Sequence, residues 1–361
     1  MGMVAITALV TAGCGGGQPD WTTRPVPRGI DTLNDVVCPS TTQCYAVGRY
    51  GTAGPGSIIG SSDGGDQWKL LMTAPEIQFS AIACPKSSTC IVGGEKKSLL
   101  PDEVPEAFVT TNDGVHWSSE AIPPLLGGVG GVACASVNVC LVIGGAAIAR
   151  TTNGGMTWVS KSYPPDLASI DSVVCPTRSF CIVGGSSQGT ASPGDSVGSP
   201  GSAVDLVSHD AGATWSRAVV AAPFVRTAGG DVSAATLGAI SCSDARQCVG
   251  VIPSYLASSA GTGSLITTSD AGRTWRRGST GVGWAISCVK TFCASVGFHT
   301  STNDHLVGDA FISTDGGVNW SPSTIHTNQI LTAVSCSSSP RCVAVGGNLP
   351  GAKSSVILTY P

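Results

Sequence analysis

The sequence predicts an all-β protein, a seven-bladed β-propeller of four-stranded antiparallel blades, closed by an N-terminal strand that completes the C-terminal blade. Three observations predict this fold. Short apolar runs bounded by Gly, Pro, Ser and Asp dominate the 361 residues, a pattern typical of strands and turns. Close pairs of cysteines recur along the chain, with their first members 41 to 67 residues apart. An eight-residue segment that ends in Trp alternates with these pairs. Repeats of roughly 40 to 50 residues with several strands each are typical of propellers.

One repeat contains the four expected strands in order. Its apolar runs are "FSAIAC" (Phe79–Cys84), "CIVGG" (Cys90–Gly94), "EAFVTT" (Glu106–Thr111) and "HWSSEAI" (His116–Ile122). The same division along the chain predicts one domain, residues 21–361. Its blades are expected at about 31–72, 77–122, 127–163, 168–222, 232–279, 284–325, and 330–361 together with 21–27.

The last repeat is incomplete at its C-terminal end. The chain stops after "SSVILTYP", which corresponds to a third strand without its turn or fourth strand. The missing piece is expected at the other end, where "DWTTRPVP" (Asp20–Pro27) precedes Cys38 much as "TWRRGST" precedes Cys288. Trp21 would then correspond to the Trp of the repeated segment. A ring closed in this way leaves no open edge between its first and last blades.

The segment that ends in Trp is predicted to be the turn between the third and fourth strands. Ser or Thr opens each copy, Asp or Asn lies five residues before the Trp, and Gly lies three before it. The Asp or Asn oxygen is expected to accept backbone N–H groups, Gly to adopt a conformation that other residues avoid, and Trp to cover the hairpin. The residues with these structural roles are Asp63, Gly65, Trp68, Asn112, Gly114, Trp117, Asn153, Gly155, Trp158, Asp210, Gly212, Trp215, Asp270, Gly272, Trp275, Asp315, Gly317 and Trp320.

This S-x-D-x-G-x-x-W pattern resembles the Asp-box, or BNR, repeat. The resemblance covers nearly all residues after Asp20, and Asn112 and Asn153 depart from it while keeping an acceptor oxygen. Such repeats occur in sialidases, sortilin-type receptors, xyloglucan-cleaving enzymes and photosystem II assembly-factor propellers. The resemblance therefore implies a sialidase-like propeller fold and leaves the activity open.

Fourteen of the 15 cysteines form seven close pairs, each around the connection between the first and second strands of a blade. Opposed positions of an antiparallel ladder are close enough for a disulfide. Metal binding is the alternative, but one pair supplies only two ligands. We therefore expect seven disulfides within blades, and neither a metal nor another cofactor. The pairs are Cys38/Cys44, Cys84/Cys90, Cys134/Cys140, Cys175/Cys181, Cys242/Cys248, Cys288/Cys293 and Cys336/Cys342.

The remaining cysteine, Cys14, ends the apolar stretch "MGMVAITALVTAGC". Residues 1–14 resemble a bacterial lipoprotein signal with Cys14 as the lipidated residue, and residues 15–20 would be a short tether. The apolar run is too short to span a bilayer. An ordinary cleaved signal peptide with a stray Cys is the alternative. Either way we expect an exported protein, as a cell-envelope lipoprotein or a secreted one, where disulfides persist.

The two ends of the predicted blades differ. Turns between strands one and two, and between three and four, share one end, here called the Asp-box face. The longer connections share the other end, here called the loop face, where binding residues usually lie. Candidate binding residues there are Tyr50, Lys96, Lys97, Phe224, Arg226, Asp231, Tyr255, His299 and His305. For each of them a solvated loop residue is the alternative.

Charge and motifs narrow the expected function. Charged residues make up 12% and the net charge is −4, which argues against a nucleic-acid partner. Sialidases use three arginines and a Tyr–Glu pair, which we cannot locate here, and "TRPVP" (Thr23–Pro27) is only a superficial echo of their Arg-Ile-Pro motif. No catalytic residue is assigned. We expect a monomeric, non-enzymatic scaffold for binding or assembly, with a protein or glycan on its loop face and a membrane contact only through a lipid anchor. A sialidase-like glycoside hydrolase and a purely structural envelope protein are the alternatives.

Overall fold

The computed structural model describes residues 20–50, 54–96, 104–124, 128–161, 166–188, 202–220, 225–226, 232–233, 236–253, 263–300, 306–338, 340–347 and 355–361. Every regular element among these residues is a β-strand, so the all-β prediction is confirmed. No described segment is a helix with the length and apolar character needed to cross a membrane.

Five of the sheets are four-stranded and antiparallel, with their strands in sequence order. They contain β6 (Ile77–Lys86), β7 (Thr89–Lys96), β8 (Val104–Thr110) and β9 (Ser118–Ala121); β10 (Gly131–Cys134), β11 (Cys140–Gly144), β12 (Ala147–Thr151) and β13 (Val159–Lys161); β14 (Leu167–Val174), β15 (Cys181–Ser187), β16 (Ala203–Ser208) and β17 (Ser216–Val219); β20 (Ala239–Cys242), β21 (Cys248–Pro253), β22 (Gly263–Thr268) and β23 (Arg276–Val282); and β24 (Ala285–Val289), β25 (Phe292–Thr300), β26 (Leu306–Ser313) and β27 (Ser321–Pro322).

The remaining long strands form one eight-stranded sheet. Its members are β1 (Thr22–Arg24), β2 (Thr32–Val37), β3 (Cys44–Arg49), β4 (Gly56–Ser61), β5 (Lys69–Ala74), β28 (Ile330–Cys336), β29 (Cys342–Gly347) and β30 (Ser355–Tyr360). A single residue pair, Thr32 with Gly347, links β2 to β29. The short strands β18 (Val225–Arg226) and β19 (Val232–Ser233) pair separately in the connection between β17 and β20.

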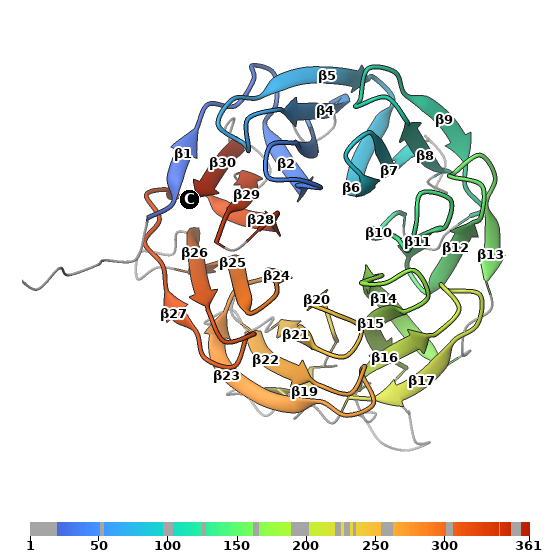
Figure 1. Ribbon diagram of the computed structural model, residues 1–361, viewed down its shortest axis with the longest axis vertical. Helices are drawn as coiled ribbons and strands as arrows, with labels where there is room; N and C mark the ends of the chain where they lie inside the picture. The colour runs from blue at the N-terminus through green and yellow to red at the C-terminus, as the bar shows by residue number, and fades with distance from the viewer. Residues whose placement is uncertain are drawn as a thin grey trace, which may run out of the picture.

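Figure 1 shows these sheets arranged around a common centre, with the first strand of each four-stranded sheet innermost and the last at the rim. In the eight-stranded sheet β2 and β28 are innermost, and β5 and β1 lie at the rim. Consecutive strands pair with each other, so the sheets are meanders whose turns alternate between two ends. Their faces are covered by apolar side chains, and each buried cluster draws residues from neighbouring sheets. The core therefore lies between sheets rather than within one, as expected for units that cannot bury a face alone.

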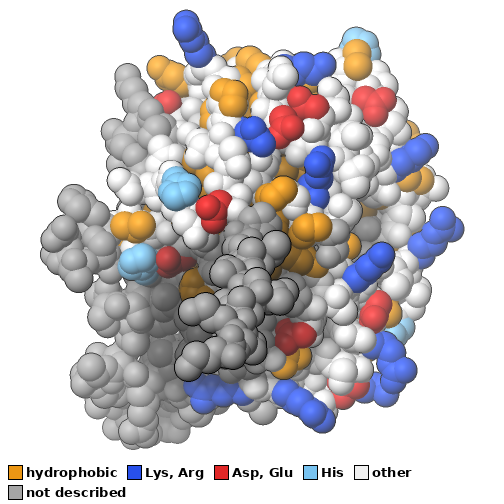
Figure 2. Space-filling view, turned by 60° about the vertical axis from the view of Figure 1, so that its left-hand side comes forward, with side chains coloured by type: hydrophobic (Ala, Val, Ile, Leu, Met, Phe, Trp, Pro, Cys, Tyr) orange, Lys and Arg blue, Asp and Glu red, His pale blue; other side chains and the backbone are white. Residues whose placement is uncertain are grey.

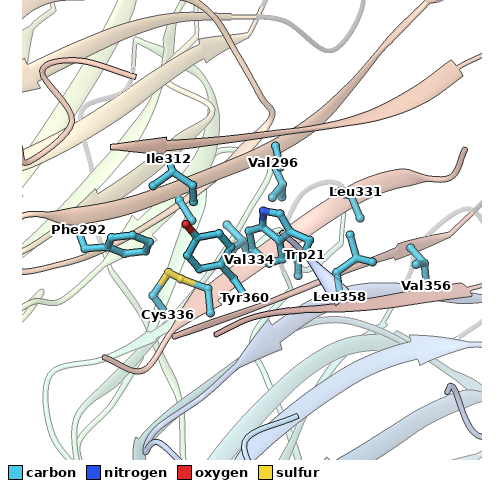
Figure 3. Packing of buried hydrophobic residues seen from close by; sticks show 14 residues of the cluster. Trp21, Phe292, Val296, Ile312, Leu331, Val334, Cys336, Val356, Leu358 and Tyr360 are labelled. Atoms are coloured by element: carbon cyan, nitrogen blue, oxygen red, sulfur yellow. A yellow bond between two sulfur atoms is a disulfide. The ribbon is translucent and has the colours of Figure 1, made fainter. Parts of the chain in front are cut away.

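The N-terminal segment lies against the last strand. β1 pairs antiparallel with β30, and Thr22 lies opposite Thr359. Trp21 is 1% exposed and its ring centroid lies 5.2 Å from that of Tyr360. Figure 3 shows both rings in one apolar cluster with Phe292 and Leu331. This packing fixes the N-terminal strand to the C-terminal one.

Candidate functional site

The six Asp-box segments form turns with one hydrogen-bond pattern. In the first box the Ser61 hydroxyl donates to Asp63 Oδ1 (2.7 Å) and accepts from the Gly65 N–H (2.9 Å), while Asp63 Oδ1 also accepts from the Gln67 N–H (2.9 Å). The same three bonds occur in the other five boxes. Two of these boxes have Asn in place of Asp, so an amide oxygen is sufficient. The box carboxylates are thus occupied within their turns.

The box glycines meet two requirements at once. Each has a positive φ, such as 97° at Gly65 and 86° at Gly317, which favours Gly. Each also lies against a strand outside its own hairpin: a Cβ on Gly317 would lie 2.5 Å from Val249 Cγ2 on β21, and one on Gly65 would lie 2.8 Å from Val343 Cγ2 on β29. The boxes therefore fasten neighbouring sheets as well as closing hairpins.

All seven predicted cysteine pairs are disulfides. Each bridges the turn between the first two strands of its unit, and Cys134 lies directly opposite Cys140 in the ladder. The bridged turns and the boxes share the Asp-box face, because both kinds of turn join strands at the same end of a meander.

The inner strands carry a repeated irregularity. β2, β6, β14 and β28 each have a register shift that skips one residue, four positions before the first Cys of the unit. The skipped residues are Asn34, Ser80, Asp171 and Thr332. Two of them reach the next inner strand: Thr332 Oγ1 on β28 donates to the Leu33 carbonyl on β2 (2.9 Å), and Asn34 Nδ2 on β2 donates to the Phe79 carbonyl on β6 (2.6 Å). This position links inner strands around the ring.

Trp284 occupies the corresponding position next to β24, four residues before Cys288. Its backbone N–H donates to the Val296 carbonyl (2.6 Å), and its half-buried ring stacks on Phe298 with a centroid distance of 5.6 Å. Where the other units have a small or polar residue, this one has a large aromatic ring near the centre. Phe298 lies on β25 toward the loop-face end of that strand.

A polar cluster lies at the corresponding end of β3, β6 and β7. Arg49 Nη1 donates to Gln78 Oε1 (2.9 Å), and the buried Nε of Arg49 has no hydrogen-bond partner among the described residues. Ser80 Oγ donates to the Glu95 carboxylate (3.3 Å), which also accepts the Val129 N–H. These side chains bring a cation, an amide and a carboxylate to the junction of two sheets.

The candidate loop-face residues fall into two groups. Three have described side chains: Tyr50, 45% exposed; Lys96, with Nζ 2.9 Å from Glu76 Oε2; and His299, with Nδ1 2.7 Å from Asp309 Oδ2. Tyr50 follows β3 and Lys96 ends β7 in the neighbouring sheet, whereas His299 belongs to another sheet with Phe298. Arg226 is in β18, but its side chain, like Cys14, Lys97, Phe224, Asp231, Tyr255 and His305, lies outside the described residues.

Sequence reasoning missed Arg49, Gln78, Glu95, Trp284 and Phe298. A signal existed for one of them. The chain has eight Trp, of which six belong to boxes and Trp21 to the terminal strand. Trp284 is the one left over. For Arg49 and Glu95 no sequence signal existed, because both end apolar strands in which a charged residue is simply the exit to solvent.

Two carboxyl groups, the half-buried Asp35 and the buried Asp205, distinguish particular units from the rest. Burial raises the pKa of Asp35 to about 7, against the backbone N–H groups of Ile82 and Val36, which lower it. Burial also raises the pKa of Asp205 to about 6, although Trp275 Nε1 donates to its Oδ2. In the fifth box the hydroxyl of Thr274 and then its N–H hold the pKa of Asp270 at about 2. Among the described residues no group of three or more His, Cys, Asp or Glu side chains could hold a metal ion.

The comparisons with known proteins agree with this geometry. The family model described as "BNR/Asp-box repeat" matches residues 311–322, which contain the last box. The fold and the six boxes together define the class of protein. The chain is a β-propeller of the BNR type.

Solved structures resemble the fold over almost the whole chain. "YCF48 bound to D1 peptide" has a TM-score of 0.60 at 15% identity and covers 95% of this chain and 97% of its own. The GH74 xyloglucanase from Xanthomonas campestris has a TM-score of 0.63 at 16% identity, and the match covers 91% of this chain and 52% of the xyloglucanase chain. A streptogramin B lyase has a TM-score of 0.60 at 9% identity, and the match covers 94% of this chain and 96% of the lyase chain. A sequence comparison with curated proteins gives no match. At these identities the likeness concerns the fold, and the function has to be argued from the site.

Proposed function

We propose that the chain is an exported, non-enzymatic binding scaffold: a propeller of seven blades that recognises a polypeptide segment on its loop face. The blade count rests on dividing the eight-stranded sheet at its single link between Thr32 and Gly347, which leaves β2–β5 as one blade and β28–β30 with β1 as another. The contact of Gly65, in the first box, with Val343 on β29 supports ring closure.

The stack of Trp284 on Phe298 is the observation that carries the binding proposal. Seven of the eight Trp serve boxes or the terminal strand, and this one does not. Trp and Arg are the residue types that most often dominate binding energy at protein interfaces. A half-buried indole beside the inner strand β24 gives a flat, rigid surface for an apolar or aromatic side chain of a partner.

Arg49 adds a polar anchor. Its guanidinium has five donors in a fixed fork, which suits carboxylate and carbonyl oxygens. Its Nη1 donates to Gln78, which holds the guanidinium at the loop-face end of β3. An extended polypeptide supplies both kinds of group, backbone carbonyls for Arg49 and side chains for Trp284. YCF48, which shares the fold, is described as bound to a peptide.

Export rests on the disulfides and on the N-terminal segment. Seven bridges in one chain fit an oxidising compartment. Lipidation of Cys14 and monomeric behaviour remain part of the proposal. Mass spectrometry of the membrane fraction would detect the acylated N-terminal peptide.

Affinity capture from envelope extract tests the binding role. Full-length protein, Trp284→Ala and a matched control, Leu70→Ala on the outer strand β5, are compared by quantitative mass spectrometry. We expect one polypeptide to be retained by the wild type and control and depleted about tenfold or more by Trp284→Ala. Equal retention by all three proteins would refute the site. A glycan as the retained molecule, or turnover of a fluorogenic glycoside panel, would refute the proposed function.

A further inference from the structure

We propose that the Asp-box face binds the surface of an anionic lipid bilayer directly, through a patch of exposed cations and through apolar residues at the tips of the box turns. This surface is at the opposite end of the strands from the peptide site, and the inference does not depend on that site. It also differs from the sequence expectation of membrane contact through a lipid anchor alone.

The cationic patch has five members, Arg246, Arg273, Arg276, Arg277 and Lys290, all of them exposed. Arg246 and Lys290 are in turns that follow the inner strands β20 and β24. Arg273 is in the fifth box, and the last two, Arg276 and Arg277, begin the outer strand β23. The carbonyl of Arg246 accepts the Ala271 N–H of that box (3.1 Å), so these segments are adjacent. Arg276, Arg277 and Lys290 line one hollow of about 550 Å³ that also contains Val318.

The patch has a net positive charge, because its five cations outnumber the three carboxylates beside them, Asp244, Asp270 and Asp315. It holds five of the 19 Lys and Arg residues in a chain of net charge −4, and none of the ion pairs found among the described residues includes any of the five. These carboxylates accept backbone N–H groups of their own turns, which leaves their negative charges in place and the patch with an excess of two positive charges. Figure 2 shows Lys and Arg side chains over the right-hand side of the view, with Asp and Glu side chains among them.

The tips of three boxes add exposed apolar side chains. Val115, Met156 and Val318 each follow the box Gly and are 69%, 63% and 58% exposed. Turns at one end of a ring of meanders lie roughly in one plane, so these tips can meet a flat surface together. In the first box the same position holds Asp66, which pairs with Arg24.

Cations beside separate apolar tips favour a bilayer as the partner. Anionic headgroups attract Lys and Arg, and short apolar side chains enter the region just below the headgroups. A soluble acidic protein would satisfy the charges but would not explain apolar tips spread over several boxes. The chain also enters the fold at this face, since Trp21 packs on Tyr360, the ladder partner of Cys342.

Vesicle sedimentation tests this surface without acylation. Full chain carrying Cys14→Ser is mixed with phosphatidylcholine vesicles or with vesicles containing phosphatidylglycerol. We expect binding to the second kind only, weakening as NaCl rises. The double variant Arg276→Gln/Arg277→Gln should lower partition about tenfold or more, because each cation near an anionic surface contributes roughly fivefold. The matched control, Arg28→Gln/Lys161→Gln, removes two charges outside the patch and should bind as the parent does.

Val318→Ser separates a bilayer from a soluble anion. This variant should lower vesicle partition severalfold and leave any retention on a soluble acidic polypeptide unchanged. Equal binding to both kinds of vesicle, or equal loss in the double variant and its control, would overturn the proposal. Binding to inorganic phosphate or acidic polypeptide that competes fully with the vesicles would also overturn it, because the patch would then be a site for soluble anions.

Discussion

The Asp-box face and the loop face are built by different rules. At the Asp-box face the same residue types recur from unit to unit: a bridged cysteine pair, Ser or Thr, Asp or Asn, Gly and Trp. At the loop-face end of the strands each unit differs, with Arg49 in one and Phe298 in another. The repeated residues thus stabilise the packing of the sheets. Residues that occur in one unit only mark the places where the protein can bind a partner. Substituting one repeated residue and one unique residue of the same type, and comparing the effects on stability and binding, tests this distinction.

The largest contrast is expected between two tryptophans. Trp21→Ala should lower the free energy of unfolding by about 3–5 kcal/mol, because a fully buried ring between β30 and its neighbours leaves a cavity. Trp284→Ala removes a half-buried ring and should cost about 1 kcal/mol or less. Urea denaturation of the two variants measures both values. Similar losses would mean that Trp284 is structural, and the binding proposal would lose its main support.

The bridged turns should each contribute less than the terminal strand. The double variant Cys134→Ser/Cys140→Ser opens a short loop and should destabilise the protein by about 2 kcal/mol, with vesicle and partner binding unchanged. Thermal melting of the variant and the parent checks the value. A loss of binding would show that this bridge shapes a recognition surface as well as a turn.

The repeated features could be predicted from the sequence, and most of the unique ones could not. Cys134 and Cys140 are recognisable because the same spacing recurs in other units. The sequence predicts that the N-terminal segment supplies the missing fourth strand of the last repeat, and only the structure gives its register, with Thr22 opposite Thr359. Arg49 and Glu95 offered no such reference, since their roles depend on which side chains of the next sheet lie beside them. Trp284 is intermediate: it is the one Trp outside the repeat, but its stacking on Phe298 depends on three-dimensional packing.

The pH dependence of stability should also separate a unique carboxyl from a repeated one. The pKa of Asp35 is about 7 in the folded protein and close to 4 in the unfolded chain. Its stabilising contribution is therefore complete below pH 4 and is lost as pH rises from 4 to 7, by about 4 kcal/mol at about 1.4 kcal/mol for each pKa unit. Asp205, with a pKa of about 6, acts in the same direction. Asp35→Asn should flatten the decline in stability between pH 5 and 8.

Asp270 provides the control with the opposite sign. Its pKa of about 2 lies below that of the unfolded chain, so its contribution is present above pH 4 and is lost as pH falls toward 2. Asp270→Asn should leave the profile between pH 5 and 8 unchanged. Unfolding free energies across the pH range of both variants measure the difference. A slope that Asp35→Asn leaves intact would assign the decline to other groups, first of all to Asp205.

The smallest expected effect concerns a difference within the repeated boxes. Ala211 precedes the Gly of the fourth box and has a φ of 57°. The equivalent residue of the sixth box is Gly316, with a φ of 78°. A left-handed conformation is unfavourable for Ala, while Gly adopts it freely but loses more entropy on folding. Ala211→Gly should therefore stabilise the protein by about 0.5–1 kcal/mol, and Gly316→Ala, whose Cβ would meet nothing within 4 Å, should destabilise it similarly. Matched urea curves check the pair. Effects of equal sign would mean that contacts of the boxes with neighbouring sheets, rather than backbone conformation, decide which residue each box carries.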